Sequence, residues 1–343
     1  MRRMSNLKGG LVPVLAVVSV LLIGWSLVMP HLGTKAEPPP AKRSRDVFAG
    51  DREPAPSLAT VKFDGQRALG YLKQLCDLGP RVSGSEAMKK QQAIAKAHFE
   101  KHGAKVELQK FTASQVSQFR PVELVNVIAS WQPERDKRVI ICTHYDTRPR
   151  ADQEPDPSKW EEPFLSANDG TAGVAWLMEL AHHMKDLPTK VGVDFVLFDG
   201  EEYVFDGPYN SKDKYFLGSD HFAGEYKRVP PKHRYTAAVL LDMAAGRNPS
   251  FPFEQNSYFK AQALATEIWG IAAEQGAAAF KNQLGHTVSD DHLALNRVGI
   301  PAVDIIDFDY PHWHRLSDKP ENCSANTMEE VAKVLTVWLQ RTH

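Results

Sequence analysis

Short apolar runs separated by polar turns recur along this chain and predict buried strands. The run at residues 193–198 is apolar apart from Asp194. Further strands are expected at residues 105–111, 123–130, 138–143, 236–243 and 301–306. Between the runs, apolar residues recur with helical spacing, which predicts amphipathic helices. These helices are expected over residues 68–78, 86–101, 171–184, 257–275 and 327–340.

Apolar strands that alternate with helices are typical of a mostly parallel sheet with helices on both faces. We therefore expect an α/β fold with a mostly parallel central sheet, built as a single domain over residues 61–343. In this fold class, loops at the carboxyl ends of the strands form the ligand site. Two long loops, at residues 148–166 and 203–215, are polar or aromatic and are candidates for that role.

The N-terminal part of the chain has a different pattern. Residues 1–10 form a basic flank, and residues 11–29 are uncharged and almost wholly apolar. That run approaches the ~20 residues that a membrane-spanning helix needs. No convincing cleavage site follows, so an uncleaved signal anchor is favoured over a cleaved signal peptide. The Pro-rich residues 30–60 are the expected linker.

The basic flank predicts that the folded domain lies outside the cytoplasm, because positive flanks stay on the cytoplasmic side of a membrane. The domain is then membrane-anchored, or secreted if the apolar segment is removed. Lys and Arg number 41 and Asp and Glu 42, with no basic stripe, which excludes a nucleic-acid partner. Three cysteines without a Cys-x-x-Cys pair exclude a disulfide framework and a thiolate metal site, although one disulfide stays possible.

An acidic turn, Asp199-Gly200-Glu201-Glu202, follows the apolar run at residues 193–198. Two adjacent carboxylates at the end of a buried strand are costly unless a positive group lies nearby. Because adjacent side chains point in different directions, one can bind a metal while the other transfers a proton. A solvated acidic turn is the alternative interpretation of this tetrad alone.

Other predicted strands also end in potential metal ligands. His144 and Asp146 follow one strand, Asp242 ends another, and His314 follows the last one. Asp169 lies at the expected start of a helix. Nitrogen and oxygen donors without thiolate suit Zn²⁺ in an open, catalytic site. Asp146 is placed to orient the His144 imidazole.

Several of these segments resemble motifs of the zinc-dependent M28 peptidase superfamily: His144-Tyr145-Asp146, Asn168-Asp169-Gly170, Asp199-Gly200-Glu201-Glu202 and Leu240-Leu241-Asp242. Within it, Ser289-Asp290-Asp291-His292 and Trp313-His314 resemble the glutaminyl-peptide cyclotransferases, or glutaminyl cyclases. The resemblance covers about residues 65–343. It implies the zinc aminopeptidase and glutaminyl cyclase-like fold, and a zinc-dependent catalytic domain.

The resemblance also implies which residues hold metal. In the cyclase branch, one zinc ion would be held by Asp169, Glu202 and His314. In a two-zinc aminopeptidase, His144 and Asp242 would hold a second ion, bridged by Asp169. All five ligands are present, so the sequence does not determine the number of ions. His312 is an alternative to His314.

The implied activity converts N-terminal glutaminyl residues of peptides to pyroglutamate and releases ammonia. Glu201 would move the protons, beside a carboxylate network of Asp242 and Asp290, with Asp291 as an alternative to Asp290. Trp313 would wall the substrate pocket. The alternatives are an M28-type zinc aminopeptidase and an inactive binding ectodomain on the same fold. The partners are peptides with a free N-terminus, and the oligomeric state is not predicted.

Two further features bear on the site. The family's pocket tryptophan after the acidic turn is absent, and the equivalent place lies near Asp206. His182 and His183 are adjacent on a predicted helix, where neighbouring positions do not share a face, so the two together are not expected to bind a metal.

Overall fold

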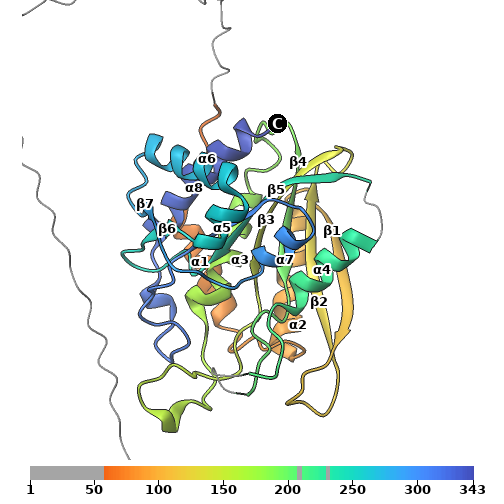
Figure 1. Cartoon of the computed structure of the whole chain (residues 1–343), viewed down its shortest axis with the longest axis vertical. Helices are drawn as coiled ribbons and strands as arrows, with labels where there is room; N and C mark the ends of the chain where they lie inside the picture. Colours follow the sequence, from red (N-terminus) through yellow and green to blue (C-terminus); the bar gives the residue numbers. More distant parts are fainter. Residues whose placement is uncertain (1–57, 207–210, 229–231) are drawn as a thin grey trace, which may run out of the picture. The chain divides into compact units, whose positions relative to one another are not determined.

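A six-stranded sheet forms the centre of the computed structural model, which describes residues 58–206, 211–228 and 232–343 (Figure 1). The strands lie in the order β1-β2-β4-β3-β5-β8. Their bounds are β1 Lys105–Ala113, β2 Val122–Trp131, β3 Lys137–His144, β4 Gly192–Phe198, β5 Arg234–Asp242 and β8 Ala302–Ile306. A separate pair, β6 (Phe251–Phe253) and β7 (Phe280–Leu284), lies outside this sheet.

Four neighbouring strands, β4, β3, β5 and β8, are parallel to one another, as the sequence predicts. At the edge, β2 is antiparallel to both β1 and β4. The carboxyl ends of the four parallel strands therefore meet at one edge of the sheet.

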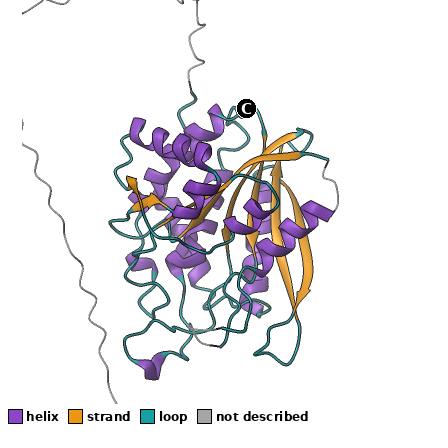
Figure 2. Ribbon diagram, viewed as in Figure 1, coloured by secondary structure: helices purple, strands orange, loops and turns teal. Residues whose placement is uncertain are grey.

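Helices cover both faces of the sheet (Figure 2). Their bounds are α1 Gly65–Cys76, α2 Glu86–Lys101, α3 Ala172–Ala181, α4 Leu217–Arg228, α5 Gln255–Lys260, α6 Gln262–Glu274, α7 His292–Arg297 and α8 Ala325–Arg341. On one face of the sheet, a large hydrophobic core includes residues of α1, α2, α3, α6 and α8. On the other face, a smaller hydrophobic core includes residues of α4 and α7. Short helical turns also occur at η1 Pro157–Lys159, η2 Ala167–Thr171 and η3 Pro320–Asn322.

The central strands are largely apolar because both of their faces are buried. In β3, Val139 and Ile141 join the larger core, whereas Ile140 and Cys142 join the smaller one. All four side chains are fully buried. Burial of one such side chain stabilises the fold by about 1.5–3 kcal/mol.

Asp194, the single charged residue in its predicted strand, is paired. The Arg138 guanidinium binds the Asp194 carboxylate from the neighbouring strand β3. The Tyr235 hydroxyl donates a hydrogen bond to the same carboxylate over 2.6 Å. A buried charge of this kind is tolerated because it is both paired and hydrogen-bonded.

The prediction of one continuous helix over residues 257–275 is wrong. Residues 257–275 form two helices, α5 and α6, because the backbone leaves the helical conformation at Ala261 (φ −134°, ψ 44°). The first helix is held separately: the Glu254 carboxylate accepts from the Ser257 amide, and the Ser257 hydroxyl accepts from the Asp304 amide of β8. The helices α4 and α7 and the pair β6–β7 were not predicted.

The three cysteines, Cys76, Cys142 and Cys323, are buried and free, so the disulfide that the sequence left possible is not formed. The basic flank at residues 1–10, the predicted anchor at residues 11–29 and the linker up to residue 57 lie outside the described residues. Among the residues that are described, no helix has the length and apolar character to cross a bilayer.

Candidate metal and active site

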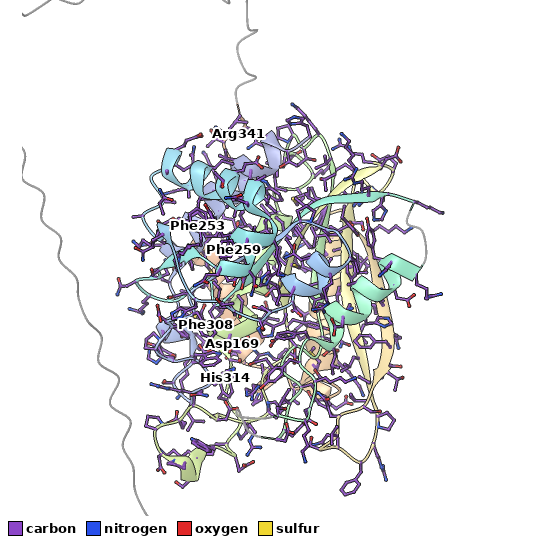
Figure 3. The ribbon with its side chains drawn as sticks, viewed as in Figure 1. Asp169, Phe253, Phe259, Phe308, His314 and Arg341 are labelled. Atoms are coloured by element: carbon purple, nitrogen blue, oxygen red, sulfur yellow. The ribbon has the colours of Figure 1, made fainter. Side chains whose placement is uncertain are left out.

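The candidate site lies where the parallel strands end. His144 is the last residue of β3 and Asp242 is the last residue of β5. Glu201 and Glu202 follow β4. Asp169 lies in the turn η2 before α3, and His314 comes from the loop after β8; Figure 3 shows these two residues at the same end of the fold.

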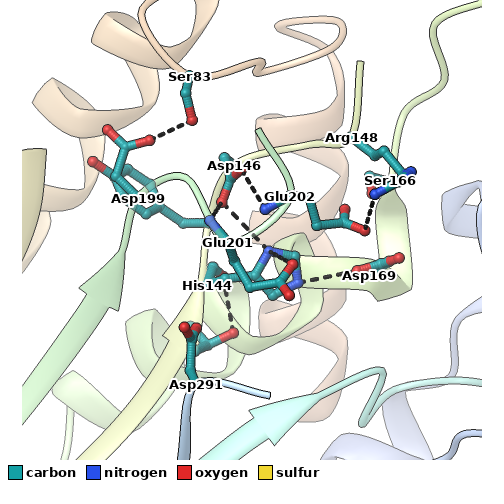
Figure 4. Close-up of polar contacts among 12 residues, drawn as sticks. Ser83, His144, Asp146, Arg148, Ser166, Asp169, Asp199, Glu201, Glu202 and Asp291 are labelled. Atoms are coloured by element: carbon teal, nitrogen blue, oxygen red, sulfur yellow. Dashed lines mark hydrogen bonds and ion pairs between the residues drawn. The ribbon is translucent and has the colours of Figure 1, made fainter. Parts of the chain in front are cut away.

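The three residues of the expected zinc set converge. His314 Nε2 lies 2.5 Å from Glu202 Oε1 and 3.6 Å from Asp169 Oδ2. His144 joins them, with its Nε2 3.0 Å from Asp169 Oδ1 (Figure 4). The same nitrogen lies 3.4 Å from Asp242 Oδ1. One donor atom each from His144, Asp169 and Glu202 lie within 4.8 Å of one another. The five predicted ligands therefore form one continuous cluster.

The turn η2 has a backbone shape that only glycine allows at its centre. Gly170 has a positive φ of 80°, and a Cβ there would lie 2.6 Å from His144 Cε1. The close approach of Gly170 lets Asp169 contact the imidazole. Asp318 holds the turn, because its carboxylate accepts from the amides of Asn168 (2.9 Å) and Asp169 (3.2 Å).

His314 is fixed by residues that the sequence reasoning missed. Its backbone is left-handed, with φ 52°, which is uncommon for a residue other than glycine and is often found at functional sites. Its Nδ1 lies 2.9 Å from Asp152 Oδ1, and Arg148 binds the other oxygen of Asp152. This arrangement leaves His314 Nε2 directed at Glu202.

Asp146 forms hydrogen bonds with the backbone of the acidic turn and not with the His144 imidazole. Its two carboxylate oxygens accept hydrogen bonds from the amides of Glu201 and Glu202, each 3.0 Å long. Its Oδ1 is 3.6 Å from His144 Nδ1, which is longer than a hydrogen bond. Asp146 therefore positions both glutamates through their backbone.

Asp199 belongs to the scaffold. Its carboxylate accepts from the Ser83 hydroxyl (2.6 Å) and the Val125 amide (2.8 Å). Figure 4 shows it directed toward Ser83 and away from Asp169. Burial and the nearby Asp146 raise the pKa of Asp199 to about 8.

The donor set fits a divalent cation. Asp169 Oδ2, Glu202 Oε2 and Asp242 Oδ1 are buried and have no hydrogen-bond partner. An unsatisfied buried acceptor costs about 1–3 kcal/mol, and more when it is charged. Burial lowers the pKa of His314, but the charge of Glu202 and the contact with Asp152 outweigh burial and raise that pKa to about 9. The electrostatic potential in the cluster is thus strongly negative, as a cation site requires.

Glu201 faces the open side of the cluster. Its side chain is 12% exposed, and its Oε2 lies 3.9 Å from His144 Nδ1. Burial, Glu202 and Asp290 raise the pKa of Glu201 well above its usual value, although the His144 charge opposes them. Burial and the neighbouring Asp242 raise the pKa of Asp290 in the same way. Glu201, Asp242 and Asp290, the predicted carboxylate network, all line one cavity.

A cavity of about 510 Å³ opens onto these groups. Its lining includes Asp169, Glu201, Glu202, Asp242, Asp290, Trp313 and His314. Trp313 packs on the His314 ring (4.2 Å between centroids) and on Phe308 (5.3 Å), which gives the cavity an aromatic wall. Tyr215 and Phe216 line the cavity from the predicted aromatic loop.

The remaining candidates lie outside the cavity lining. His312 Nδ1 lies 2.8 Å from the Ser317 hydroxyl. Asp291 is fully buried behind Asp290. His292 is also fully buried, with its Nε2 3.2 Å from Glu254 Oε2. Of the paired alternatives in the sequence, the cavity therefore exposes Asp290 and His314.

Comparison with known proteins agrees with this geometry. The model of peptidase family M28 matches residues 126–339, and the chain belongs to this family. The glutaminyl-peptide cyclotransferase of Gloydius blomhoffii is 27% identical over 248 residues, which cover 62% of this chain and 64% of that protein. The chain thus spans 64% of the length of that curated relative.

Solved structures are similar over most of the folded part. The crystal structure of Fimbriiglobus ruber glutaminyl cyclase is 51% identical, with a TM-score of 0.82, and the match covers 85% of this chain and 100% of that one. A leucine aminopeptidase precursor from Bacteroides thetaiotaomicron is 30% identical, with a TM-score of 0.77 and coverage of 84% and 100%. Proteins described as a glutaminyl cyclase and as a leucine aminopeptidase precursor therefore share this fold.

Proposed function

We propose that this protein is a zinc-dependent glutaminyl-peptide cyclotransferase. The observation that carries the proposal is the placement of Asp290 and Trp313, two residues of the cyclase-like motifs, in one cavity with Glu201. The similarity to Fimbriiglobus ruber glutaminyl cyclase over the whole of that chain supports the same activity.

We assign Asp169, Glu202 and His314 as the ligands of one zinc ion. The unsatisfied oxygens of Asp169 and Glu202 and the Asp152-oriented imidazole of His314 are the features that support this set. When bound there, zinc supplies a Lewis acid that polarises the carboxamide oxygen of the substrate. The protein residues supply the binding, the orientation and the proton transfer.

In the reaction, the α-amine of an N-terminal glutamine attacks its own side-chain carboxamide carbon. A new C–N bond closes the five-membered ring, and the original C–N bond breaks to release ammonia. Glu201 accepts a proton from the attacking amine and donates one to the leaving nitrogen. Because the attack is intramolecular, the cavity mainly has to hold the substrate in a conformation that brings its reacting atoms into contact. Trp313, which lines the cavity, is placed to hold the substrate in this way.

The carboxylates around Glu201 tune this proton transfer. Their mutual repulsion and their burial raise the pKa values of Glu201 and Asp290. A carboxyl group with a raised pKa can hold the proton between its removal from the amine and its delivery to the leaving nitrogen. We assign Asp242 and Asp290 to this supporting role.

A zinc aminopeptidase is the second candidate, and one observation favours it. His144 Nε2 lies 3.0 Å from Asp169 Oδ1 and 3.4 Å from Asp242 Oδ1, so the residues of a second ligand set are also close together. Two zinc ions would then be bound, and Glu201 would activate water to attack a peptide carbonyl. An inactive binding ectodomain is disfavoured by the complete ligand set and both glutamates.

One pair of assays separates the two enzymes. A glutaminyl peptide should yield ammonia and a pyroglutamyl product, and an amino-acid anilide should stay intact. Cleavage of the anilide without ammonia release from the glutaminyl peptide would reject the cyclase assignment.

We also propose that the catalytic domain works outside the cytoplasm, held by the apolar segment at residues 11–29 or released from it. The support is the basic flank before that segment. Carbonate extraction of membranes tests the anchored form, and a fully soluble, N-terminally trimmed product would reject it.

A further inference from the structure

Three histidines meet far from the cavity, at the far ends of two packed helices. His98 lies in the last turn of α2 and His102 follows that helix, one turn further on. His182 follows the last residue of α3. One ring nitrogen from each of the three lies within 4.8 Å of the others. The three side chains are partly exposed, so the cluster is open to solvent.

The rings face one another closely. The centroid distances are 4.7 Å between His98 and His102, 4.1 Å between His102 and His182, and 5.4 Å between His98 and His182. Helix positions four residues apart lie on the same face, which brings His98 and His102 together. The third member comes from a different helix, so this site could not be predicted from the spacing within either one.

In two of the rings, one nitrogen already has a hydrogen-bonding partner outside the cluster. His98 Nε2 lies 2.7 Å from the Met178 carbonyl oxygen, so this nitrogen carries the hydrogen and leaves Nδ1 with a free lone pair. His182 Nε2 lies 2.7 Å from the Tyr71 hydroxyl. Metal-binding histidines typically make such an outer contact, which fixes the ring and its tautomer.

An unpaired ring nitrogen of His102 is a second, independent observation that points to a bound ligand. Its Nε2 is buried and has no hydrogen-bond partner. A simple aromatic cluster would leave this nitrogen unsatisfied, at a cost of about 1–3 kcal/mol. Burial lowers the pKa of His98 and His102, and lowers that of His182 to about 4. The rings are therefore neutral near pH 7, which is the form that binds metal.

We propose that His98, His102 and His182 form a second metal site, specific for Zn²⁺ or Cu²⁺, that ties the end of α2 to the end of α3. Three imidazoles and one water complete a four-coordinate site, and an all-nitrogen set selects these ions over Mg²⁺ and Ca²⁺. The site is separate from the catalytic cluster. Asp169 precedes α3 and His182 follows it, and the 10 residues of that helix span about 15 Å.

The test uses the untagged full-length protein, with Zn²⁺ and Cu²⁺ alone as probes. Equilibrium dialysis with metal analysis should show that wild type holds one more zinc ion than His102→Gln. The same variant should keep its turnover with the glutaminyl peptide, or with the anilide if that is the substrate. The Cu²⁺ spectrum in electron paramagnetic resonance should show coupling to three nitrogens in wild type and to fewer in His102→Gln.

His183→Gln is the matched control, because His183 is adjacent to His182 but its ring contacts Glu179 (3.3 Å). It should bind the additional ion as wild type does. Tyr71→Phe should weaken binding about 10-fold or more, as loss of an outer partner does. Circular dichroism checks that each variant folds, and His182→Gln replaces His102→Gln if the latter does not.

Two results would overturn the proposal. One is equal zinc content and equal affinity in wild type, His102→Gln and His182→Gln. The other is an equal loss of metal in His183→Gln, which would indicate nonspecific binding at surface histidines. Neither result bears on the catalytic assignment, because that assignment rests on ammonia release and not on the total number of ions.

Discussion

Glu201 and Glu202 are adjacent in sequence but have different surroundings. The side chain of Glu202 is 4% exposed and contacts His314, whereas that of Glu201 is 12% exposed and faces the cavity. The difference follows from the turn after β4, in which Asp146 holds both amides and the side chains diverge. One turn thus provides both a metal ligand and a proton carrier.

Replacement of Glu201 by Gln should lower turnover at least about 100-fold, because the amide cannot accept the proton of the attacking amine. Zinc should stay bound, because the ligands are untouched. Ammonia release and zinc content, measured on the same sample, check both statements. Glu202→Gln is the comparison and should lose zinc as well as activity. Unchanged turnover in a zinc-replete Glu201→Gln protein would reject the role of Glu201.

Asp152→Asn should weaken zinc binding about 10- to 100-fold, because the carboxylate that orients His314 is lost. Competition with a chromophoric chelator measures the affinity. Asp156→Asn is a control from the same loop, since that exposed carboxylate only accepts from the Ser158 amide and hydroxyl. If both variants bind zinc as tightly as wild type, the orientation of His314 does not depend on Asp152.

At the scale of the elements, Glu179 connects two helices. It lies in α3 with its side chain fully buried, and Arg67 of α1 binds both of its oxygens, each over 2.6 Å. The Asp64 amide also donates to it over 3.0 Å. Burial raises the pKa of Glu179, but contacts with His183 and Arg67 outweigh burial and lower that pKa to about 2.

The depressed pKa predicts how stability depends on pH. Stabilisation by ionised Glu179 is complete above the unfolded pKa of about 4.5 and is lost as the pH falls toward 2. It amounts to about 3 kcal/mol at pH 7 and about half of that at pH 3. In urea unfolding, Glu179→Gln should therefore lie below wild type at pH 7, with a smaller gap at pH 3.

Glu100→Gln controls for surface charge, because the Lys96–Glu100 pair is exposed and contributes about 0–1 kcal/mol. A gap between Glu179→Gln and wild type that stays constant from pH 7 to pH 3 would contradict the assignment. It would mean that shape and packing, and not ionisation of Glu179, account for the difference.

The elements also show what the sequence can predict. The central strands of the sheet and the ligands that follow them could be predicted, because a strand buried on both faces has to be largely apolar. The helix α4 could not, because its only buried apolar side chains, Phe222 and Ala223, are adjacent and give no helical period. The break at Ala261 also has no local signal, since alanine is a strong helix former.

The same limit applies to the two metal clusters. Asp152 could not be assigned because its partner His314 is 162 positions away and nothing in the loop pattern distinguishes it from other acidic residues. The local sequence pairs His182 only with its neighbour His183, whereas its partners His98 and His102 come from the end of α2. Contacts between elements, which the spacing of residues within one element does not report, determine both clusters.

At the scale of the whole molecule, the active site is a product of the complete fold. Its residues come from β3, η2, the turn after β4, the end of β5 and the loop after β8. No ligand pair within hydrogen-bond distance is close in sequence, so the unfolded chain offers no comparable site. Metal that binds only the native state stabilises it by mass action.

Removal of zinc should therefore lower the melting temperature. At a free zinc concentration about 100 times the dissociation constant, bound metal contributes about 2.7 kcal/mol. For a folded domain of about 280 residues, that corresponds to a shift of about 4–5 °C. Calorimetry before and after dialysis against a chelator measures the shift, and added Zn²⁺ but not Mg²⁺ should restore it. In Glu202→Gln, which lacks an active-site ligand, the shift should be clearly smaller. Equal shifts in that variant and wild type would mean that the stabilising zinc is bound elsewhere than between Asp169, Glu202 and His314.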